Sequence, residues 1–590
     1  MPTAETPRRW AWPGLAAVLA VGLGLRLWGV GQGLPYAYNA DEADHFLPRA
    51  VAMFEHGLNP HYFANPPAFT YLLHFLLALF YGGKTGVQHA FAVDPTEVYT
   101  MARVAAAVLG VAALWLLYVT GARLFGRGVG LLAAAIEAVA FLPVFYAHLA
   151  LNDVPTLAPL TLSLLGTAGV LRNGRTREYL LAGLGLGLAC ATKYTAGIAL
   201  VPSVAAVAAR YLGGDSGAAR RAVSGIALAA AAALLAFLIA NPYAVLDFQS
   251  FHRDLVHQST LSSEAQGKLG APRHGGLVYY LWSLTWGLGW APALAALAGA
   301  VTVWRSDRSL GWLLVPAPLL FLAFMSLQGR YFGRWLLPIF PIACLLAAFF
   351  ALRAADVLAG AAARRWPRRR RGPRHPQAEV GRSVLMSARS RTPRGLPAAL
   401  TALFAAVVLA QGVLYSVHSG LVLSRADTRS LTRAWMVAHI PAGTPIVVEP
   451  VAPDAWGSRW NKYPSLALRI SASGALAPGS LALVSIEDYE RTLSPTLIGY
   501  YERYGYCWVV SGTTQSGRAF ADPTAVPAAI AYYRALAAEG EVVYRASPYA
   551  RGRGPVAFGF DWSFDYYPLA YDRPGPAMTV YRLHGGRCQR

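Results

Sequence analysis

The chain has 590 residues, of which 55% are hydrophobic and only 14% are charged, whereas a soluble globular protein carries roughly 25% charged residues. Long apolar runs fill the sequence up to about residue 423 and are missing after it. This composition excludes a single soluble enzyme and indicates an integral membrane protein with a further region of different character.

The formal charge of +21 does not indicate a nucleic-acid partner, because nearly half of it lies in one short segment. Residues 361–395 hold eleven Arg and one Glu, between two apolar runs. Basic loops mark the cytoplasmic side of a membrane protein, where anionic lipids attract them. We therefore interpret residues 354–396 as a cytoplasmic, lipid-facing loop. A binding tail is the alternative.

About eleven apolar runs are predicted to cross the membrane. They lie near residues 14–30, 98–119, 128–146, 155–171, 179–193, 196–211, 222–241, 277–303, 311–327, 334–353 and 397–422. If the N-terminus is inside, the Arg-bearing turns between these runs fall on the cytoplasmic side, as the positive-inside rule requires. The first run resembles a cleaved signal peptide, but the many spans that follow favour an uncleaved helix.

The predicted topology depends on the run from Phe69 to Phe80 not crossing. With about a dozen apolar residues it is more typical of an interfacial or re-entrant helix, and we place it on the outer face. The loop of residues 31–97, the loop near 148–155 and everything after about residue 423 then share the outer side. A loop of this length, rich in Pro, His, Asn and aromatic residues, is a candidate functional element.

The region 424–590 is predicted to be an extracytoplasmic soluble α/β domain. Its β-like runs and helical periods lie at residues 445–449, 481–485, 430–439 and 526–539. Two of the four cysteines, Cys507 and Cys588, are in this region. They can pair only if the region is extracytoplasmic, and the sequence leaves the pairing open.

Three carboxylates and a histidine are crowded into five positions just after the first span: Asp41, Glu42, Asp44 and His45. If Asp41 begins a helix, then Asp41, Asp44 and His45 share one face by their i, i+3 and i+4 spacing. The alternative is an N-cap followed by a solvated turn. The location at a membrane boundary favours a functional cluster.

Two further outer segments carry polar residues. Asn65 precedes Pro66-Pro67 and the short apolar run, and Asp153 stands where a span begins, a position that also suits a plain helix N-terminus. Glu137 lies near the middle of a predicted span, where a carboxylate is costly in lipid, so we expect it to face the helix bundle. The sequence names no partner for it.

The order of these motifs resembles glycosyltransferase family 39, which includes the protein O-mannosyltransferases. Asp41-Glu42 is followed by His45-Phe46 and then by Pro66-Pro67, as in the first extracytoplasmic loop of that family. The similarity extends over about residues 10 to 353. Further matches are Tyr99, Arg103, Gly121 to Gly126, Asn152-Asp153 with Pro155, Thr192-Lys193-Tyr194, Arg330-Tyr331 and Leu336-Leu337-Pro338.

The resemblance implies the GT-C membrane fold and an inverting transfer of a sugar from a polyprenyl-phosphate donor. By similarity, Asp41 is the catalytic carboxylate and Arg103 contacts the donor phosphate. The aminoarabinose transferases share this architecture and also carry a C-terminal extracytoplasmic domain. They have Lys before Pro-Pro where this chain has Asn65, so the phosphate contact credited to that Lys is absent or comes from elsewhere.

Elementary chemistry favours the same role for this cluster. A lipid phosphate is a good leaving group, so catalysis needs a base for the acceptor hydroxyl and cations for the departing phosphate. The predicted catalytic residues are Asp41 and Glu42. The predicted substrate-binding residues are Asp44, His45, Asn65, Arg103, Asp153, Lys193, Arg330 and Arg334. Snorkelling to the membrane interface is the alternative interpretation of Arg103 and Lys193.

A metal site is the alternative for Asp41, Asp44 and His45, because oxygen ligands suit Mg²⁺ or Mn²⁺. A dedicated site would need further ligands such as Asp153 or His148, and no spacing connects them. We predict that no cofactor is required. No pattern for a Ser or Cys nucleophile and no Walker-type glycine-rich loop is present.

The sequence thus predicts a catalytic all-α transmembrane domain of GT-C type over residues 1–423, with about eleven transmembrane helices and additional helices on the outer face, followed by the α/β domain. The expected partners are a polyprenyl-phosphate-linked sugar, membrane lipids and a protein, lipid or glycan acceptor. A transporter or flippase for a lipid-linked sugar is one alternative, although no repeated halves with broken helices are visible. A membrane-anchored binding or assembly protein is the other.

Overall fold

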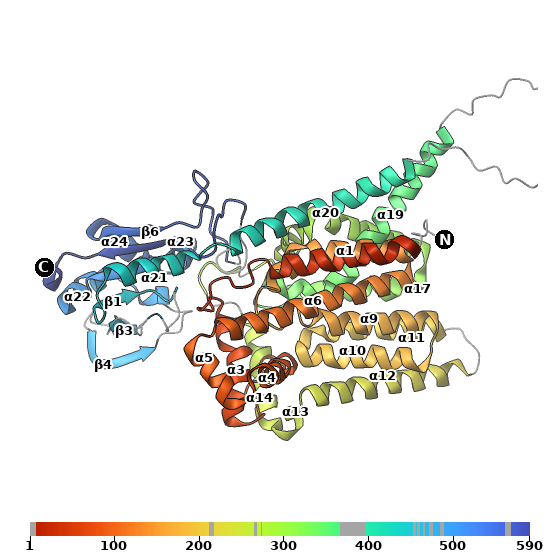
Figure 1. The fold of residues 1–590 in the computed structure, drawn as a ribbon, viewed down its shortest axis with the longest axis horizontal. Coiled ribbons are helices and arrows are strands. Elements are labelled where there is room, and N and C mark those ends of the chain that lie inside the picture. The colour runs from red at the N-terminus through yellow and green to blue at the C-terminus, as the bar shows by residue number, and fades with distance from the viewer. Residues whose placement is uncertain are drawn as a thin grey trace, which may run out of the picture.

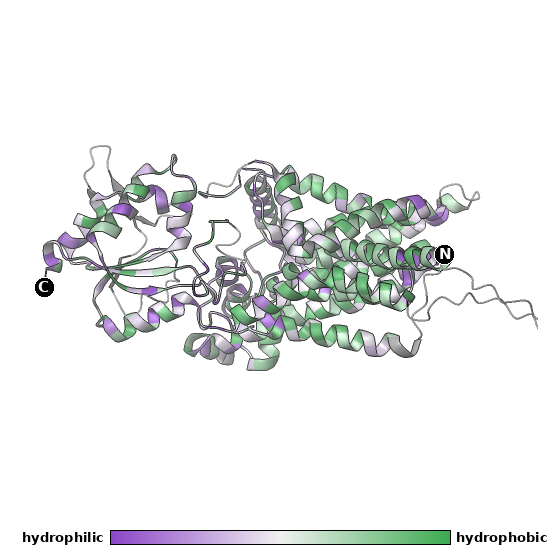
Figure 2. Ribbon diagram, turned by 90° about the horizontal axis from the view of Figure 1, so that it is seen from above, coloured by the Kyte–Doolittle hydropathy of each residue, from purple (hydrophilic) through white to green (hydrophobic). Residues whose placement is uncertain are grey.

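The computed structural model describes residues 8–211, 217–264, 268–272, 274–365, 396–451, 456, 461–463, 466–470, 476–483, 489–560 and 568–589. It has a helical part and, beyond the last long helix, a part built around a β-sheet (Figure 1). Hydrophobic residues dominate the helical part, whereas the sheet-containing part mixes polar and apolar residues (Figure 2).

The helical part contains helices where the sequence has its predicted spans. These are α1 (Arg8–Leu27), α6 (Thr96–Leu124), α7 (Arg127–Val139), α8 (Phe141–Tyr146), α9 (Leu157–Arg172), α10 (Thr176–Thr192), α11 (Leu200–Tyr211), α12 (Ala218–Ala240), α15 (Gly276–Leu284), α16 (Trp290–Ser306), α17 (Arg308–Leu314), α18 (Pro316–Ser326), α19 (Phe340–Arg365) and α20 (Leu396–Leu423). Short turns join several of them, at Tyr194–Ala199 (η1), Thr285–Gly289 (η2) and Gly333–Ile339 (η3). Each predicted apolar run coincides with one helix or with successive helices.

Within the described residues, six helical stretches are long and apolar enough to cross a membrane. They are Thr96–Leu124, Ala218–Ala240, Gly276–Ser306, Arg308–Ser326, Gly333–Arg364 and Leu396–His439. The shorter apolar helices include Ala11–Leu27 and Leu157–Arg172. The chain is therefore a multi-pass membrane protein, and the number of about eleven crossings stays a prediction.

Small residues allow the helices of the bundle to approach closely. A Cβ atom added at Gly166 of α9 would lie 2.2 Å from the backbone N of Ala182 in α10. One added at Gly183 of α10 would lie 2.1 Å from the carbonyl oxygen of Ala229 in α12. Because lipid tails are as apolar as the side chains, helices in a membrane associate largely through such packing.

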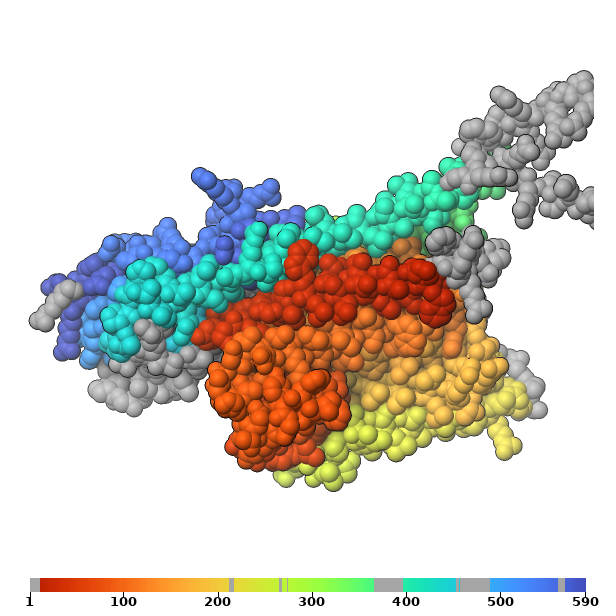
Figure 3. Space-filling view, in the orientation of Figure 1, coloured from red at the N-terminus to blue at the C-terminus, as the bar shows by residue number. Residues whose placement is uncertain are grey.

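A set of shorter helices lies at the same end of the bundle as the sheet-containing part (Figures 1 and 3). They are α2 (Ala40–Asp44), α3 (Leu47–His56), α4 (Ala68–Tyr81), α5 (Lys84–Val93), α13 (Tyr243–Leu246) and α14 (Phe248–Ser263). Figure 1 shows α4 nearly end-on, whereas the long helices run across the view. This crosswise helix contains the run Phe69 to Phe80, in the arrangement expected of a segment that does not cross.

The N-terminus, the end of α19 and the start of α20 lie at the opposite end of the bundle (Figure 1). The predicted cytoplasmic loop joins α19 to α20, and its residues 366–395 lie outside the described residues. The shorter helices therefore lie at one end of the bundle, and the end of α19 and the start of α20 lie at the other.

The C-terminal part has a five-stranded sheet in the order β2-β1-β5-β7-β6 and a separate hairpin of β3 and β4. In the sheet β1 runs parallel to β2 and β5, while β7 is antiparallel to β5 and β6. The strands are β1 (Pro445–Val448), β2 (Asn461–Tyr463), β3 (Leu466–Ile470), β4 (Leu476–Leu483), β5 (Trp508–Gly512), β6 (Glu541–Ala546) and β7 (Met578–Arg582). The helices are α21 (Thr428–His439), α22 (Thr496–Tyr504), α23 (Thr513–Ala521) and α24 (Pro527–Glu539), with short turns at Tyr489–Thr492 (η5) and Gly586–Cys588 (η6).

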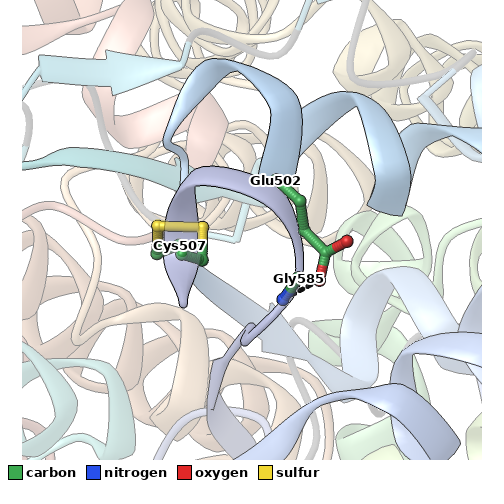
Figure 4. Close-up of a disulfide and its surroundings, with 4 residues drawn as sticks. Glu502, Cys507 and Gly585 are labelled. Carbon is green, nitrogen blue, oxygen red and sulfur yellow. Dashed lines mark hydrogen bonds between the residues drawn. A yellow bond between two sulfur atoms is a disulfide. The ribbon is translucent and has the colours of Figure 1, made fainter. Parts of the chain in front are cut away.

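Cys507 and Cys588 form a disulfide that ties the start of β5 to the C-terminal turn (Figure 4). Beside it, the backbone N–H of Gly585 donates to Glu502 Oε1 at 2.7 Å. The pairing that the sequence left open is therefore made, between cysteines 81 positions apart. The other two cysteines, Cys190 and Cys344, are free.

Candidate active site

A cavity of about 810 Å³ is lined by residues of α2 and α14 and of the segments next to α4, α10 and α19. Seven of the ten predicted site residues line it, from four separate segments of the chain. They are Asp41, His45, Asn65, Asp153, Lys193, Arg330 and Arg334. The other three, Glu42, Asp44 and Arg103, are not among its lining residues.

Asp41 lies in the first turn of α2. The N-cap of this helix is Asn39, whose side chain accepts a hydrogen bond from the backbone N–H of Glu42 at 3.2 Å. Because Asn39 supplies the cap, the Asp41 carboxylate is available to the cavity, and 39% of its side chain is accessible. It forms an ion pair with Arg334, which comes from the segment before α19.

The environment of Asp41 keeps it ionised. Burial alone would raise the pKa of this carboxyl, but Arg334, with smaller contributions from His45 and Lys268, outweighs burial and lowers the pKa below its ordinary value of 3.8. For His45, burial is the largest influence and lowers the pKa below 6.5 against the opposing effect of Asp41. At neutral pH the cavity therefore presents an aspartate beside a neutral histidine.

An aromatic stack holds His45 in place. Its ring lies 4.9 Å from that of Tyr62 in a stacked arrangement, and the Arg49 guanidinium lies 4.0 Å from the Tyr62 ring centroid. The Tyr62 hydroxyl accepts a hydrogen bond from Asn65 Nδ2 at 2.8 Å. Tyr62 was not among the site residues predicted from the sequence, although it lies between two motifs of the same loop, His45-Phe46 and Pro66-Pro67.

The basic residues of the cavity differ in their surroundings. Lys193, at the end of α10, is paired with Asp153. The buried Arg330 Nε has no hydrogen-bond partner among the described residues. A donor without a partner is costly unless a ligand or water satisfies it, so Arg330 is well suited to bind an anion that enters the cavity.

Glu42 and Arg103 do not line the cavity and form a buried ion pair with each other. Both side chains have 0% exposure, and the guanidinium Nε and Nη2 donate to the two Glu42 carboxylate oxygens at 2.8 Å each. Arg103 Nη1 donates to the carbonyl oxygens of Val30 and Gln32, and Glu42 accepts from the N–H of Ala150. Since these groups satisfy one another, we expect them to act as a structural pair, and their roles as a base and a phosphate contact stay predictions from the sequence.

The alternative metal constellation is not assembled. Asp44 is exposed and lines no part of the cavity, whereas Asp153 is held by Lys193. His148 is buried, and its ring nitrogens face backbone carbonyls of Val144, Phe145 and Trp28. In the part of the chain that the structure describes, no group of three or more His, Cys, Asp or Glu side chains could hold a metal ion.

Glu137 faces the bundle interior, as expected, with 1% exposure. Arg26 of α1 lies against it: the guanidinium donates to the backbone carbonyls of Glu137 at 3.3 Å and Ala138 at 3.0 Å. The sequence did not name this neighbour because the two residues are 111 positions apart. These hydrogen bonds go to the backbone, and the two carboxylate oxygens of Glu137 have no hydrogen-bond partner among the described residues.

Comparisons with known proteins define the class of the chain. No curated protein sequence matches it. The oligosaccharyltransferase of Archaeoglobus fulgidus in the apo form aligns over 92% of this chain and 74% of its own, at 13% identity and a TM-score of 0.52. ArnT from Cupriavidus metallidurans, bound to undecaprenyl phosphate, aligns over 98% of both chains at 14% identity, with a TM-score of 0.47. The first of these likenesses shows that the chain has the GT-C fold.

A further structure of the Archaeoglobus fulgidus enzyme, AglB in complex with an inhibitory peptide and a dolichol-phosphate, aligns over 91% of this chain and 73% of its own, at 13% identity and a TM-score of 0.50. The family model described as dolichyl-phosphate-mannose-protein mannosyltransferase matches residues 64–245. This match confirms the resemblance to glycosyltransferase family 39 over the stretch that it covers. The chain thus has the GT-C fold, and its residues 64–245 are similar to a family of membrane mannosyltransferases.

Proposed function

We propose that the chain transfers a sugar from a polyprenyl-phosphate donor to an acceptor hydroxyl at the outer membrane face, with inversion of the anomeric centre. The observation that carries this proposal is the cavity that joins Asp41 to Lys193, Arg330 and Arg334. It combines a carboxylate for the acceptor with cations for a leaving phosphate. The acceptor class, protein, lipid or glycan, is left open by these residues.

In the proposed reaction, Asp41 accepts the proton of the acceptor hydroxyl as the acceptor oxygen forms its bond to the anomeric carbon. The bond from that carbon to the phosphate oxygen breaks, and its electron pair leaves with the polyprenyl phosphate. Arg330 and Arg334 stabilise the departing phosphate, since a guanidinium can bind two oxygens at once. Arg334 would then exchange its partner Asp41 for the phosphate, which would leave the aspartate available as a base.

An apolar pocket beside the cavity supports a lipid donor. It has a volume of about 290 Å³ and is lined by residues of α4, α6, α9 and α10, among them Phe69, Leu109 and Leu188. Thr192, which directly precedes Lys193, also lines it. A polyprenyl chain could lie here while its phosphate reaches Lys193. The names of the matched family and of the AglB complex, both of which include dolichyl or dolichol phosphate, agree with such a donor.

The transfer assay uses purified protein, a polyprenyl-phosphate sugar and an extract of candidate acceptors. We expect release of polyprenyl phosphate that depends on the extract, and little change on addition of EDTA, because basic residues rather than a metal would neutralise the leaving group. Loss of activity with EDTA and its recovery with Mg²⁺ or Mn²⁺ would assign the leaving-group role to a metal. Absence of donor consumption with every extract would contradict the proposed function.

We further propose that residues 31–97 and 424–590 are extracytoplasmic and that the N-terminus is cytoplasmic. The arginine-rich turns support this orientation, as does the disulfide Cys507–Cys588, because such bonds persist in oxidising compartments.

Thiol labelling of intact cells tests the orientation. In a chain whose Cys190 and Cys344 are replaced by Ala, we expect an impermeant maleimide to label Glu55→Cys and Glu539→Cys. Arg175→Cys, in the turn between α9 and α10, is the matched inside control and should react only after permeabilisation. All three positions are exposed. Labelling of Arg175→Cys alone in intact cells would reverse the scheme.

A further inference from the structure

The turn of residues 268–272, between α14 and α15, belongs to the helical part by sequence but is held by the C-terminal part. Leu269 is fully buried, and it is a member of the hydrophobic core that contains Val447, Val509 and Leu536 of the sheet and its helices. The backbone N–H of Ala271 donates to the carbonyl oxygen of Lys268 at 3.3 Å, which closes the turn. One side chain of this connection is thus part of the core of the other structural unit.

A close approach at the next residue keeps the turn in this position. Gly270 has φ +74°, in the region that favours glycine. A Cβ atom added there would lie 2.6 Å from Phe558 Cε1 and 3.0 Å from Ala521 Cβ. Both neighbours belong to the C-terminal part. The turn therefore contacts that part through the backbone of Gly270 as well as through the side chain of Leu269.

Lys268, the residue before Leu269, lines two cavities at once. One is the candidate active site with Asp41 and Arg330. The other cavity has a volume of about 460 Å³. Its lining includes Tyr38, which precedes α2, and Thr514 at the start of α23. Lys268 is close enough to Asp41 to lower the pKa of that carboxyl. Lys268 and the proposed base Asp41 therefore line the same cavity and interact electrostatically.

We propose that Lys268 binds the phosphate of the lipid-linked donor and that Leu269 is a positioning residue through which the C-terminal part holds Lys268 in the active site. This inference rests on the proposed function. It adds a fourth basic position to the cavity that Lys193, Arg330 and Arg334 also line. It also gives the C-terminal part a defined task, because the core that contains Leu269 is otherwise built from residues of that part.

The test measures binding of undecaprenyl phosphate to the full-length protein in detergent by native mass spectrometry. We expect Lys268→Gln to raise the dissociation constant about tenfold, as expected for loss of one charge-assisted hydrogen bond, and Lys268→Arg to retain most of the affinity. Arg253→Gln is the matched control, because Arg253 is an exposed basic residue of α14 outside the cavity. Equal binding by wild type and Lys268→Gln would overturn the inference.

The role of Leu269 is tested by a double-mutant cycle. Leu269→Ala should weaken binding although Leu269 does not line the cavity, and Leu269→Ala combined with Lys268→Gln should bind no worse than Lys268→Gln alone. Additive losses would show that Leu269 does not act through Lys268. Leu269→Val is the milder variant if the Ala variant does not fold. Wild-type protein that fails to bind undecaprenyl phosphate would contradict the proposed donor itself, which separates the two failures.

Discussion

Replacement of Asp41 by Asn is expected to reduce kcat/KM for sugar transfer by a factor of about 10² to 10⁴, the range typical of a lost general base. The amide keeps the shape of the side chain but cannot take the acceptor proton. The melting temperature should stay near that of wild type, because the Asp41 side chain is 39% accessible and its ion pair with Arg334 lies at the cavity surface.

Asp44→Asn is the matched control for this experiment. Asp44 is in the same short helix, is exposed and does not line the cavity, so its replacement should leave kcat/KM within about twofold. If Asp41→Asn retained more than about a tenth of the wild-type kcat/KM, equivalent to a loss under about 1.4 kcal/mol, Asp41 would not be the essential base.

The pH dependence of the same reaction follows from the lowered pKa of Asp41. The Asp41 carboxyl is ionised, and can act as a base, at every pH above its pKa, which is below 3.8. Protonation of Asp41 should therefore lower kcat/KM only when the pH approaches this lowered pKa. A decline of kcat/KM that is already complete between pH 7 and pH 5 would point to a different base.

Removal of one partner of the buried pair Glu42–Arg103 is expected to have the largest effect on stability. Glu42→Gln or Arg103→Ala leaves an uncompensated group in a place where both side chains have 0% exposure, which typically costs about 3–5 kcal/mol. Arg103→Lys keeps the charge but cannot make the paired hydrogen bonds to Glu42 and the contacts to Val30 and Gln32. We expect it, too, to be destabilised.

The measurement is thermal melting in detergent together with donor KM for the fraction that stays folded. The exposed pair Arg425–Asp572 is the control, since 46% and 39% of its side chains are accessible, and Arg425→Gln should cost no more than about 1 kcal/mol. If Arg103 contacted the donor phosphate, Arg103→Lys would raise donor KM at an unchanged melting temperature. If Arg103 instead acts only as the structural partner of Glu42, Arg103→Lys should lower the melting temperature and leave donor KM unchanged.

Much of the helical part could be predicted from the sequence, because hydrophobic periodicity and length are local properties. Each apolar run coincides with helix, and the short run from Phe69 to Phe80 lies crosswise in α4. The strand expected at 445–449 is β1, and the helical periods at 430–439 and 526–539 are in α21 and α24.

The candidate site could be predicted only in part. Seven of the ten predicted site residues line one cavity, because polar residues at one end of neighbouring apolar helices lie in the same layer of the structure. Glu42 and Asp44 are in the same crowded motif as Asp41, but their direction depends on how α2 begins. The Asn39 cap turns Asp41 to the cavity, Glu42 into the core and Asp44 to the surface.

The amino-acid sequence by itself determined where the apolar helices form, because hydrophobicity and its periodicity are local properties. Only the tertiary structure decided which charges neutralise one another: Arg103 pairs with Glu42 across 61 positions, and Arg334 with Asp41 across 293. It also decided that Lys268 reaches the cavity, through a turn buried in a distant core. The physical reason is that burial and ion pairing depend on distances between side chains, and a sequence specifies these only after the whole chain has packed.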